Sequence, residues 1–169
     1  MAKLKLATQA RKAIVLIKAF SKHFVNFFHS EHFELFDSII KPILLYGAEV
    51  WGTSLAVEIE QIQAKFCKEF LGVNKTTNEC MKLGECGRLP LCSDYYSKCI
   101  KYWTKLVHMP NVRYPNNRML KGSDDIGRNT WASSVKHLLY IHGFGYVWLV
   151  QDVGNVDMFL FNFKDGLKQ

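Results

Sequence analysis

Apolar residues recur every three or four positions through most of this 169-residue chain, and this spacing predicts a mostly helical fold. In the first such stretch, from Leu4 to Phe24, the apolar positions fall on one face of a helix: Leu6, Ala10, Ala13, Ile14, Ile17, Phe20 and Phe24. A helix with one apolar face must bury that face against another element. Because 49% of the chain is hydrophobic, it can supply the core of about one domain, or of one domain and a small annex.

The stretch over residues 41–52, KPILLYGAEVWG, interrupts this pattern with Pro42, Gly47 and two large aromatic residues. Pro42 has no backbone N–H and restricts the residue before it, so the helix that enters this stretch should stop or kink there. Helical structure can resume after Pro42, because proline fits the first turn of a helix. We expect Gly47 to mark the close approach of another element, with Tyr46 and Trp51 packed beneath it.

Capping residues mark the ends of the other expected helices. Ser30 can cap the helix that precedes the proline, and Ser54 can cap a third helix that ends at Gly72. Further helices are expected over residues 93–107, 130–143 and 156–164, the last of them capped by Asn155. The remaining segments are a connection with one short helical turn over 74–90, an exposed loop over 109–127, and a strand or helix over 146–150.

Cysteine usage and hydropathy indicate the class of protein. The five cysteines, at positions 67, 80, 86, 92 and 99, are an odd number in a chain without an export signal, which predicts reduced thiols and an intracellular protein of the nucleus or cytoplasm. Their spacing is wider than that of zinc sites, so we expect no metal and no other cofactor. No apolar run approaches the roughly 20 residues of a membrane span, so we expect no membrane partner.

Two polar clusters have the composition of a catalytic or metal site but lack its surroundings. Asp124 and Asp125 are adjacent, like the metal-binding aspartates of polymerases, but they lie in a polar loop rather than on an apolar hairpin. His23, His29 and His32 lie near a helix junction, and we interpret them as ordinary loop and cap residues. The sequence therefore predicts no catalytic residue and no enzymatic activity of this chain.

The positive charge is concentrated at the N-terminal end. Residues 1–30 carry six basic and no acidic residues, whereas the remaining 139 positions carry 16 basic and 15 acidic residues. Basic residues at helical spacing can follow a phosphate backbone, and the candidate nucleic-acid-binding residues are Lys5, Arg11, Lys12, Lys18 and Lys22. A solvated helix face and a mitochondrial transit peptide are the alternatives for this segment.

Five motifs occur here in the order in which they follow the palm domain of reverse transcriptases from non-LTR (LINE-type) retrotransposons. Residues 35–36 and 41–52 resemble the segment just after the palm, and Ile59-Glu60, Phe66 and Leu71-Gly72-Val73 resemble the next helix and its end. Residues 84–91, GECGRLPL, resemble the family's Gly-Glu-Leu-Gly-Arg-x-Pro-Leu motif, with Cys86 in place of leucine. The series is completed by Tyr102-Trp103, Lys105, Trp131, Val135, Gly143-Phe144 and Val147-Trp148.

The resemblance implies the thumb of such an enzyme and the helical region beyond it, with the polymerase and endonuclease chemistry upstream of this chain. It implies a mostly α fold, with a thumb-like helical domain over 1–73, whose second helix is kinked, and a helical extension over 74–169 that is truncated at its C-terminus. A thumb grips the template–primer duplex through backbone contacts, so the expected partner is an RNA–DNA hybrid or duplex, bound without sequence preference. The alternatives are a small helical protein-interaction module and an inert transposon-derived product, and self-association is left open.

Overall fold

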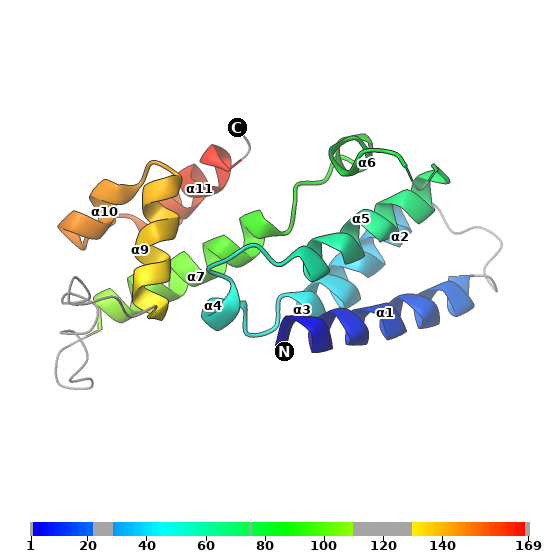
Figure 1. The fold of residues 1–169 in the computed structure, drawn as a ribbon, viewed down its shortest axis with the longest axis horizontal. Helices are drawn as coiled ribbons and strands as arrows, with labels where there is room; N and C mark the ends of the chain where they lie inside the picture. Colours follow the sequence, from blue (N-terminus) through cyan, green and yellow to red (C-terminus); the bar gives the residue numbers. More distant parts are fainter. Residues whose placement is uncertain (1, 22–28, 75, 110–129, 168–169) are drawn as a thin grey trace. The chain divides into compact units, whose positions relative to one another are not determined.

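In a computed structural model, residues 2–21, 29–74, 76–109 and 130–167 are described; they are mostly helical and contain no strand, which confirms the predicted fold class (Figure 1). The chain forms two compact units. Unit 1 comprises Met1–Tyr46 and Ala56–Leu91, and unit 2 comprises Gly47–Leu55 and Cys92–Gln169. These bounds differ from the ranges 1–73 and 74–169, because residues 47–55 leave unit 1 for unit 2 and residues 74–91 stay with unit 1.

Unit 1 is built from long helices that lie side by side (Figure 1). They are α1 (Ala2–Ser21), a run formed by α2 (His29–Leu35), the π-helix η1 (Phe36–Ile40) and α3 (Lys41–Leu44), and α5 (Val57–Leu71), with α6 (Glu79–Glu85) packed on α5. The core between them consists of aromatic and branched side chains, among them Phe36, Ile40, Leu44, Ile59, Ile62 and Phe66. Their burial follows from the three- and four-residue spacing of apolar positions in each helix.

Helical structure continues through Pro42 instead of stopping there. Pro42 is the second residue of α3, directly after the end of η1. The turn before it widens into the π-helix η1, in which the N–H of Lys41 bonds to the carbonyl oxygen of Phe36, five residues earlier. The change of helical type at this place accommodates the proline within a continuous run.

The predicted caps have mixed outcomes. Ser30 lies inside α2, and the N-cap position of α5 belongs to Ala56 rather than to Ser54, so both of these serine predictions were wrong. Gly72 ends α5 in a left-handed conformation with φ +64°, as predicted. Asn155, as predicted, accepts a hydrogen bond from a backbone N–H group in the first turn of α11 (Val156–Gly166). Thr130, near which a helix was expected to begin, caps α9 (Trp131–Ile141) in the same way.

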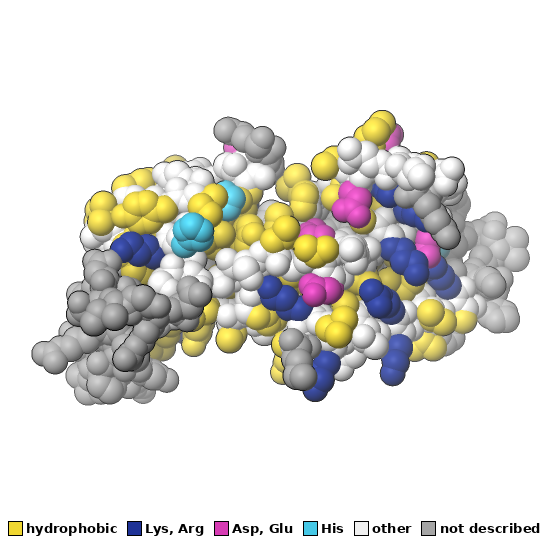
Figure 2. Space-filling model, viewed as in Figure 1, with side chains coloured by type: hydrophobic (Ala, Val, Ile, Leu, Met, Phe, Trp, Pro, Cys, Tyr) yellow, Lys and Arg dark blue, Asp and Glu magenta, His cyan; other side chains and the backbone are white. Residues whose placement is uncertain are grey.

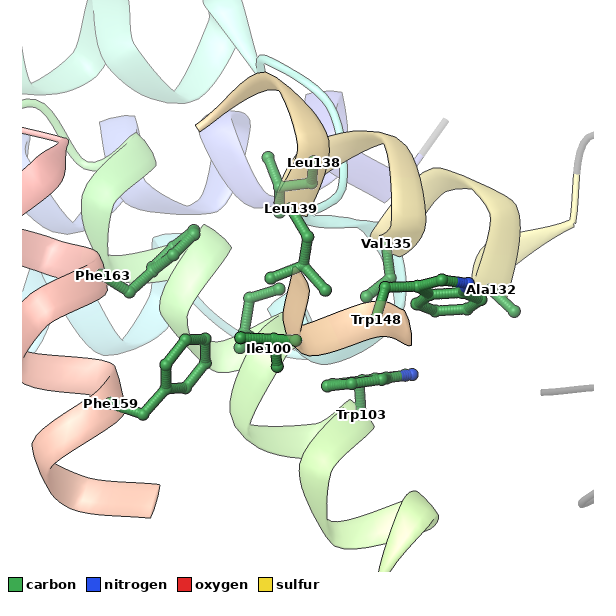
Figure 3. Close-up of a cluster of buried hydrophobic side chains, with 10 residues drawn as sticks. Ile100, Trp103, Ala132, Val135, Leu138, Leu139, Trp148, Phe159 and Phe163 are labelled. Atoms are coloured by element: carbon green, nitrogen blue, oxygen red, sulfur yellow. The ribbon is translucent and has the colours of Figure 1, made fainter. Parts of the chain in front are cut away.

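Unit 2 packs α4 (Ala48–Trp51), α9 and α11 on the long helix α7 (Cys92–Val107), and α10 (Gly145–Val150) packs on α9. Residues 146–150, left open as strand or helix, are therefore helical. Figure 3 shows the core of this unit, in which the rings of Trp103 and Trp148 stack with centroids 5.5 Å apart and planes inclined by 20°. The surrounding cluster contains Ile100, Ala132, Val135, Leu138, Leu139, Val147, Phe159 and Phe163.

A glycine allows α4 to approach α7 closely, but it is Gly52 rather than the predicted Gly47. A Cβ atom at Gly52 would lie 3.0 Å from the carbonyl oxygen of Tyr95 and 3.1 Å from Sγ of Cys99, so a side chain has no room there. The Cys99 thiol also donates a hydrogen bond of 3.0 Å to the carbonyl oxygen of Ala48. A Cβ atom at Gly47 would make only an ordinary contact of 4.0 Å with Nε1 of Trp51, and the φ of +63° shows that this glycine is needed for backbone conformation.

The two aromatic residues of the stretch over residues 41–52 have different environments. The ring of Trp51 packs on that of Tyr95, with centroids 5.5 Å apart, within unit 2. Tyr46 is 76% exposed at the end of its unit 1 segment, so the prediction that it is packed was wrong. The stretch ends a segment of unit 1 and then forms α4, the helix that packs on α7 in unit 2. This change of unit explains why it contains both a proline and two glycines.

Candidate nucleic-acid interface

Packing within unit 1 determines which face of α1 is exposed. The helix contacts α5, α3 and η1 through one buried stripe, consisting of Leu6, Ala7, Ala10, Ile14 and Ile17. Ala7 and Ala10 have no exposed surface, and such short side chains allow the backbones of neighbouring helices to come close. Since this stripe is fixed against the core, the opposite side of α1 faces solvent.

Three of the five predicted nucleic-acid-binding residues lie exposed on that solvent side: Lys5, Arg11 and Lys12. Within the described part of the chain, these three side chains have no ion-pair or hydrogen-bond partner. Lys18 is also exposed but forms an ion pair with Glu69 of α5, with 45% and 32% of the two side chains exposed. Lys22 lies outside the described residues. Four of the predicted residues thus lie on one helix, and the ion pair with Glu69 neutralises part of the charge of Lys18.

The four cations form two rows along α1. Lys5 and Lys12 are seven residues apart, as are Arg11 and Lys18, so each row spans about two turns or about 10 Å. One strand of duplex DNA carries a phosphate every ~3.4 Å of helix axis, so each row matches about three phosphate steps. The rows lie roughly 100° apart around the helix axis. A groove or backbone ridge laid along α1 can therefore meet cations on both of its sides.

Exposed apolar side chains lie among these cations, which the sequence pattern did not lead us to expect. Leu4, Val15 and Leu16 are 56%, 65% and 60% exposed. Val15 is three or four residues from Arg11, Lys12 and Lys18, so it lies next to them on the helix surface. Figure 2 shows basic and hydrophobic side chains side by side over α1. The sequence did contain a sign of this exposure, because α1 has more apolar residues than one buried stripe can hold.

The segment over residues 84–91, which resembles a family motif, packs against the helices of unit 1. The guanidinium carbon of Arg88 lies 5.1 Å from the ring centroid of Phe33 and 5.0 Å from that of Phe36. Both terminal nitrogens of Arg88 also donate hydrogen bonds to the carboxylate of Asp37. These contacts place a cation between two aromatic faces and a carboxylate, an arrangement that stabilises the guanidinium in place.

Two polar side chains of α5 hold the other end of the same segment. Nε2 of Gln63 donates a hydrogen bond of 3.1 Å to the carbonyl oxygen of Leu89, and the backbone N–H of Leu91 donates one of 3.0 Å to Oε2 of Glu60. Leu91 itself is fully buried. The segment therefore ties α5 to the run formed by α2 and η1, and α1 rests on α5 and η1. Its role is to position the helices beneath α1.

The polar candidates for a metal site and the Cys67 thiol have the following places in the structure. Among the described residues, no group of three or more His, Cys, Asp or Glu side chains could hold a metal ion. The thiol of Cys67 has its pKa raised to about 12 by burial and by the neighbouring Cys86 thiol, so it stays protonated at neutral pH. His32 packs edge-on against the ring of Phe70. The other polar candidates, Asp124, Asp125 and His23, lie outside the described residues, as does the side chain of His29.

In the described segments, every helix is too short or too polar to cross a membrane. Comparison with protein-family models, with curated proteins and with solved structures returned no match to this chain. The resemblance to non-LTR reverse transcriptases therefore depends on the order of its motifs alone, and it remains a prediction.

Proposed function

We propose that this chain binds the sugar–phosphate backbone of an RNA–DNA hybrid or duplex through the exposed face of α1, without sequence preference, and that it supplies binding rather than catalysis. The observation that carries this proposal is the set of exposed cations at Lys5, Arg11 and Lys12, on a helix that has no acidic residue. The resemblance to the thumb region of non-LTR reverse transcriptases supports a template–primer duplex as the ligand. Backbone contacts of this kind position a protein on a duplex without reading its sequence.

The mixed character of the face favours binding over simple solvation. A helix face that only meets water is usually polar, whereas here Leu4, Val15 and Leu16 are more than half exposed beside the cations. A nucleic-acid backbone presents anionic phosphates with sugar carbon atoms between them. Lysine and arginine can pair with the phosphates while the apolar side chains contact the sugars, so both kinds of side chain have a partner.

The strength and salt dependence of binding follow from the number of cations. Each phosphate that a lysine or arginine neutralises contributes about −0.9 to the slope of log K against log salt concentration, so three contacts give about −2.7. Affinity should then fall about 40-fold between about 50 mM and about 200 mM monovalent salt. Binding should be weak and equal for two hybrids of unrelated sequence, because the face makes no base-specific contact in this proposal.

The experiment is a fluorescence-anisotropy titration of a short RNA–DNA hybrid across a salt series, with a matched pair of double variants. Lys5→Gln with Lys12→Gln removes two cations from α1, and Lys101→Gln with Lys105→Gln removes two exposed cations from α7. Both variants have the same net charge. We expect the α1 variant to reduce the magnitude of the salt slope by about 1.8 and the α7 variant to leave it unchanged.

Three results would contradict the proposal: no binding at about 50 mM salt, binding that does not change with salt, or an equal effect of the two double variants. The last result would show that affinity follows net charge rather than the face of α1. Circular dichroism of each variant checks that the helices persist, which we expect because all four lysines are exposed.

A further inference from the structure

Helix α10 is apolar around its whole circumference, yet one side of it is at the surface. Its residues run GYVWLV, and Val147 and Trp148 are buried in the core of unit 2, at 1% and 7% exposure. In contrast, Tyr146, Leu149 and Val150 are 60%, 72% and 67% exposed. Their spacing of three and four residues puts them on one face. A helix with this composition is normally covered on all sides, so the exposed face of α10 lacks the cover that its sequence predicts.

The end of α9 extends this apolar face. Ile141 is 62% exposed and Tyr140 is 48% exposed. The ring of Tyr140 lies so close to the first turn of α10 that a Cβ atom at Gly145 would be only 2.9 Å from it, so the two helices form one surface. We call this surface the α10 patch; it consists of Tyr140, Ile141, Tyr146, Leu149 and Val150. Figure 2 shows hydrophobic side chains gathered over α10.

We propose that the α10 patch is the interface of a symmetric homodimer of this chain. No Lys, Arg, Asp or Glu occurs between Leu138 and Gln151, so two copies can bring their patches together without placing like charges in contact. The basic face of α1 cannot serve this purpose, because a symmetric contact would set its lysines against one another. Lys136 precedes the patch in the sequence and Asp152 follows it, so charges of opposite sign flank it. In a two-fold dimer, Lys136 of one copy can lie opposite Asp152 of the other at the rim of the interface.

The size of the patch determines how strong such a dimer is. Each of the five side chains exposes roughly 100 Å² of apolar surface, which gives on the order of 500 Å² per copy. Two copies would bury about 1,000 Å², at the low end of specific interfaces. The structure therefore points to a reversible dimer that forms as concentration rises. This inference does not depend on nucleic-acid binding by α1, because α10 and α1 belong to different units.

Sedimentation velocity of the full chain from about 2 μM to about 500 μM tests the dimer, since this range covers the dissociation constants expected of a small interface. A reducing buffer is needed because Cys80 is exposed and can form intermolecular disulfides. We expect a monomer–dimer equilibrium for the unaltered chain. Leu149→Glu puts a carboxylate into the contact in each copy, and we expect it to weaken dimerisation at least about tenfold per copy, or about 100-fold in total.

Two further variants separate the patch from general effects of charge and folding. Val50→Glu adds the same charge at a residue that is 69% exposed and belongs to α4, a helix that lies away from α10 in Figure 1, and it should dimerise like the unaltered chain. Val150→Arg adds a charge of the opposite sign within the patch and should weaken dimerisation as strongly as Leu149→Glu does. The proposal is overturned if the unaltered chain stays monomeric throughout, if either patch variant dimerises normally, or if Val50→Glu loses the dimer.

Discussion

Replacing Arg88 tests whether the segment over residues 84–91 is a packing element rather than a nucleic-acid contact. Arginine is the residue that a sequence comparison would select as a phosphate ligand, because its planar guanidinium pairs well with phosphate. In this structure the guanidinium is occupied by Phe33, Phe36 and Asp37, and only 13% of the Arg88 side chain is exposed. We therefore expect substitution to affect the stability of unit 1 and to leave hybrid binding by the folded protein unchanged.

The magnitude can be worked out from these contacts. A cation–π contact at a partly exposed site contributes about 0.5–1 kcal/mol, so the two rings together contribute about 1–2 kcal/mol. The Asp37 carboxylate is 47% exposed, and an ion pair of this kind contributes up to about 1 kcal/mol. Arg88→Ala should therefore reduce the free energy of unfolding by about 1–3 kcal/mol and lower Tm by about 2–12 °C. Arg88→Lys should lose most of this stabilisation, because lysine lacks the planar guanidinium that contacts both rings and pairs with the carboxylate.

Thermal and urea denaturation followed by circular dichroism measure these changes, and hybrid titration at a temperature where each variant is folded measures binding. Asp37→Asn is the matched control, because it removes the ion pair but keeps both aromatic contacts, and it should cost only about 0.5–1 kcal/mol. The reasoning is refuted if Arg88→Ala lies within about 0.5 kcal/mol of the unaltered chain. It is equally refuted if Arg88→Lys keeps full stability but loses hybrid affinity.

Glu69→Gln removes the carboxylate that pairs with Lys18 and should make the salt slope more negative by up to about 0.9, at a cost in stability below about 1 kcal/mol; an unchanged slope in the hybrid titration would show that this ion pair does not limit phosphate binding. Burial lowers the pKa of His142 below its ordinary value of 6.5, and its ring packs edge-on against Phe163. The unfolded chain then takes up the proton more readily than the folded chain. The stability that comes from burying the neutral His142 ring is therefore complete above about pH 6.5 and is lost as the pH falls below that value. Urea unfolding between about pH 7.5 and about pH 5.5 should show this loss, and His142→Gln should remove it; parallel profiles for the two proteins would contradict the assignment.

The candidate interface illustrates how far sequence patterns reach. The exposure of Lys5, Arg11 and Lys12 was predictable, because these positions lie off the apolar stripe of α1, with Arg11 on one flank and Lys5 and Lys12 on another. The pairing of Lys18 with Glu69 was not, because the two residues are 51 positions apart and nothing in their local spacing connects them. The exposure of Val15 was missed for a related reason: hydropathy identifies an apolar residue but does not tell whether a partner covers it.

The sequence by itself determined where several helices begin and end. A cap such as Thr130 or Asn155 bonds to a backbone group three residues away, and Gly72 ends α5 through its own backbone conformation, so each signal acts within one turn. Only the tertiary structure decided that Gly52 rather than Gly47 lies at a close contact, because the atoms that approach it belong to Tyr95 and Cys99. Contacts between residues so far apart in the chain depend on packing geometry, which local spacing does not encode.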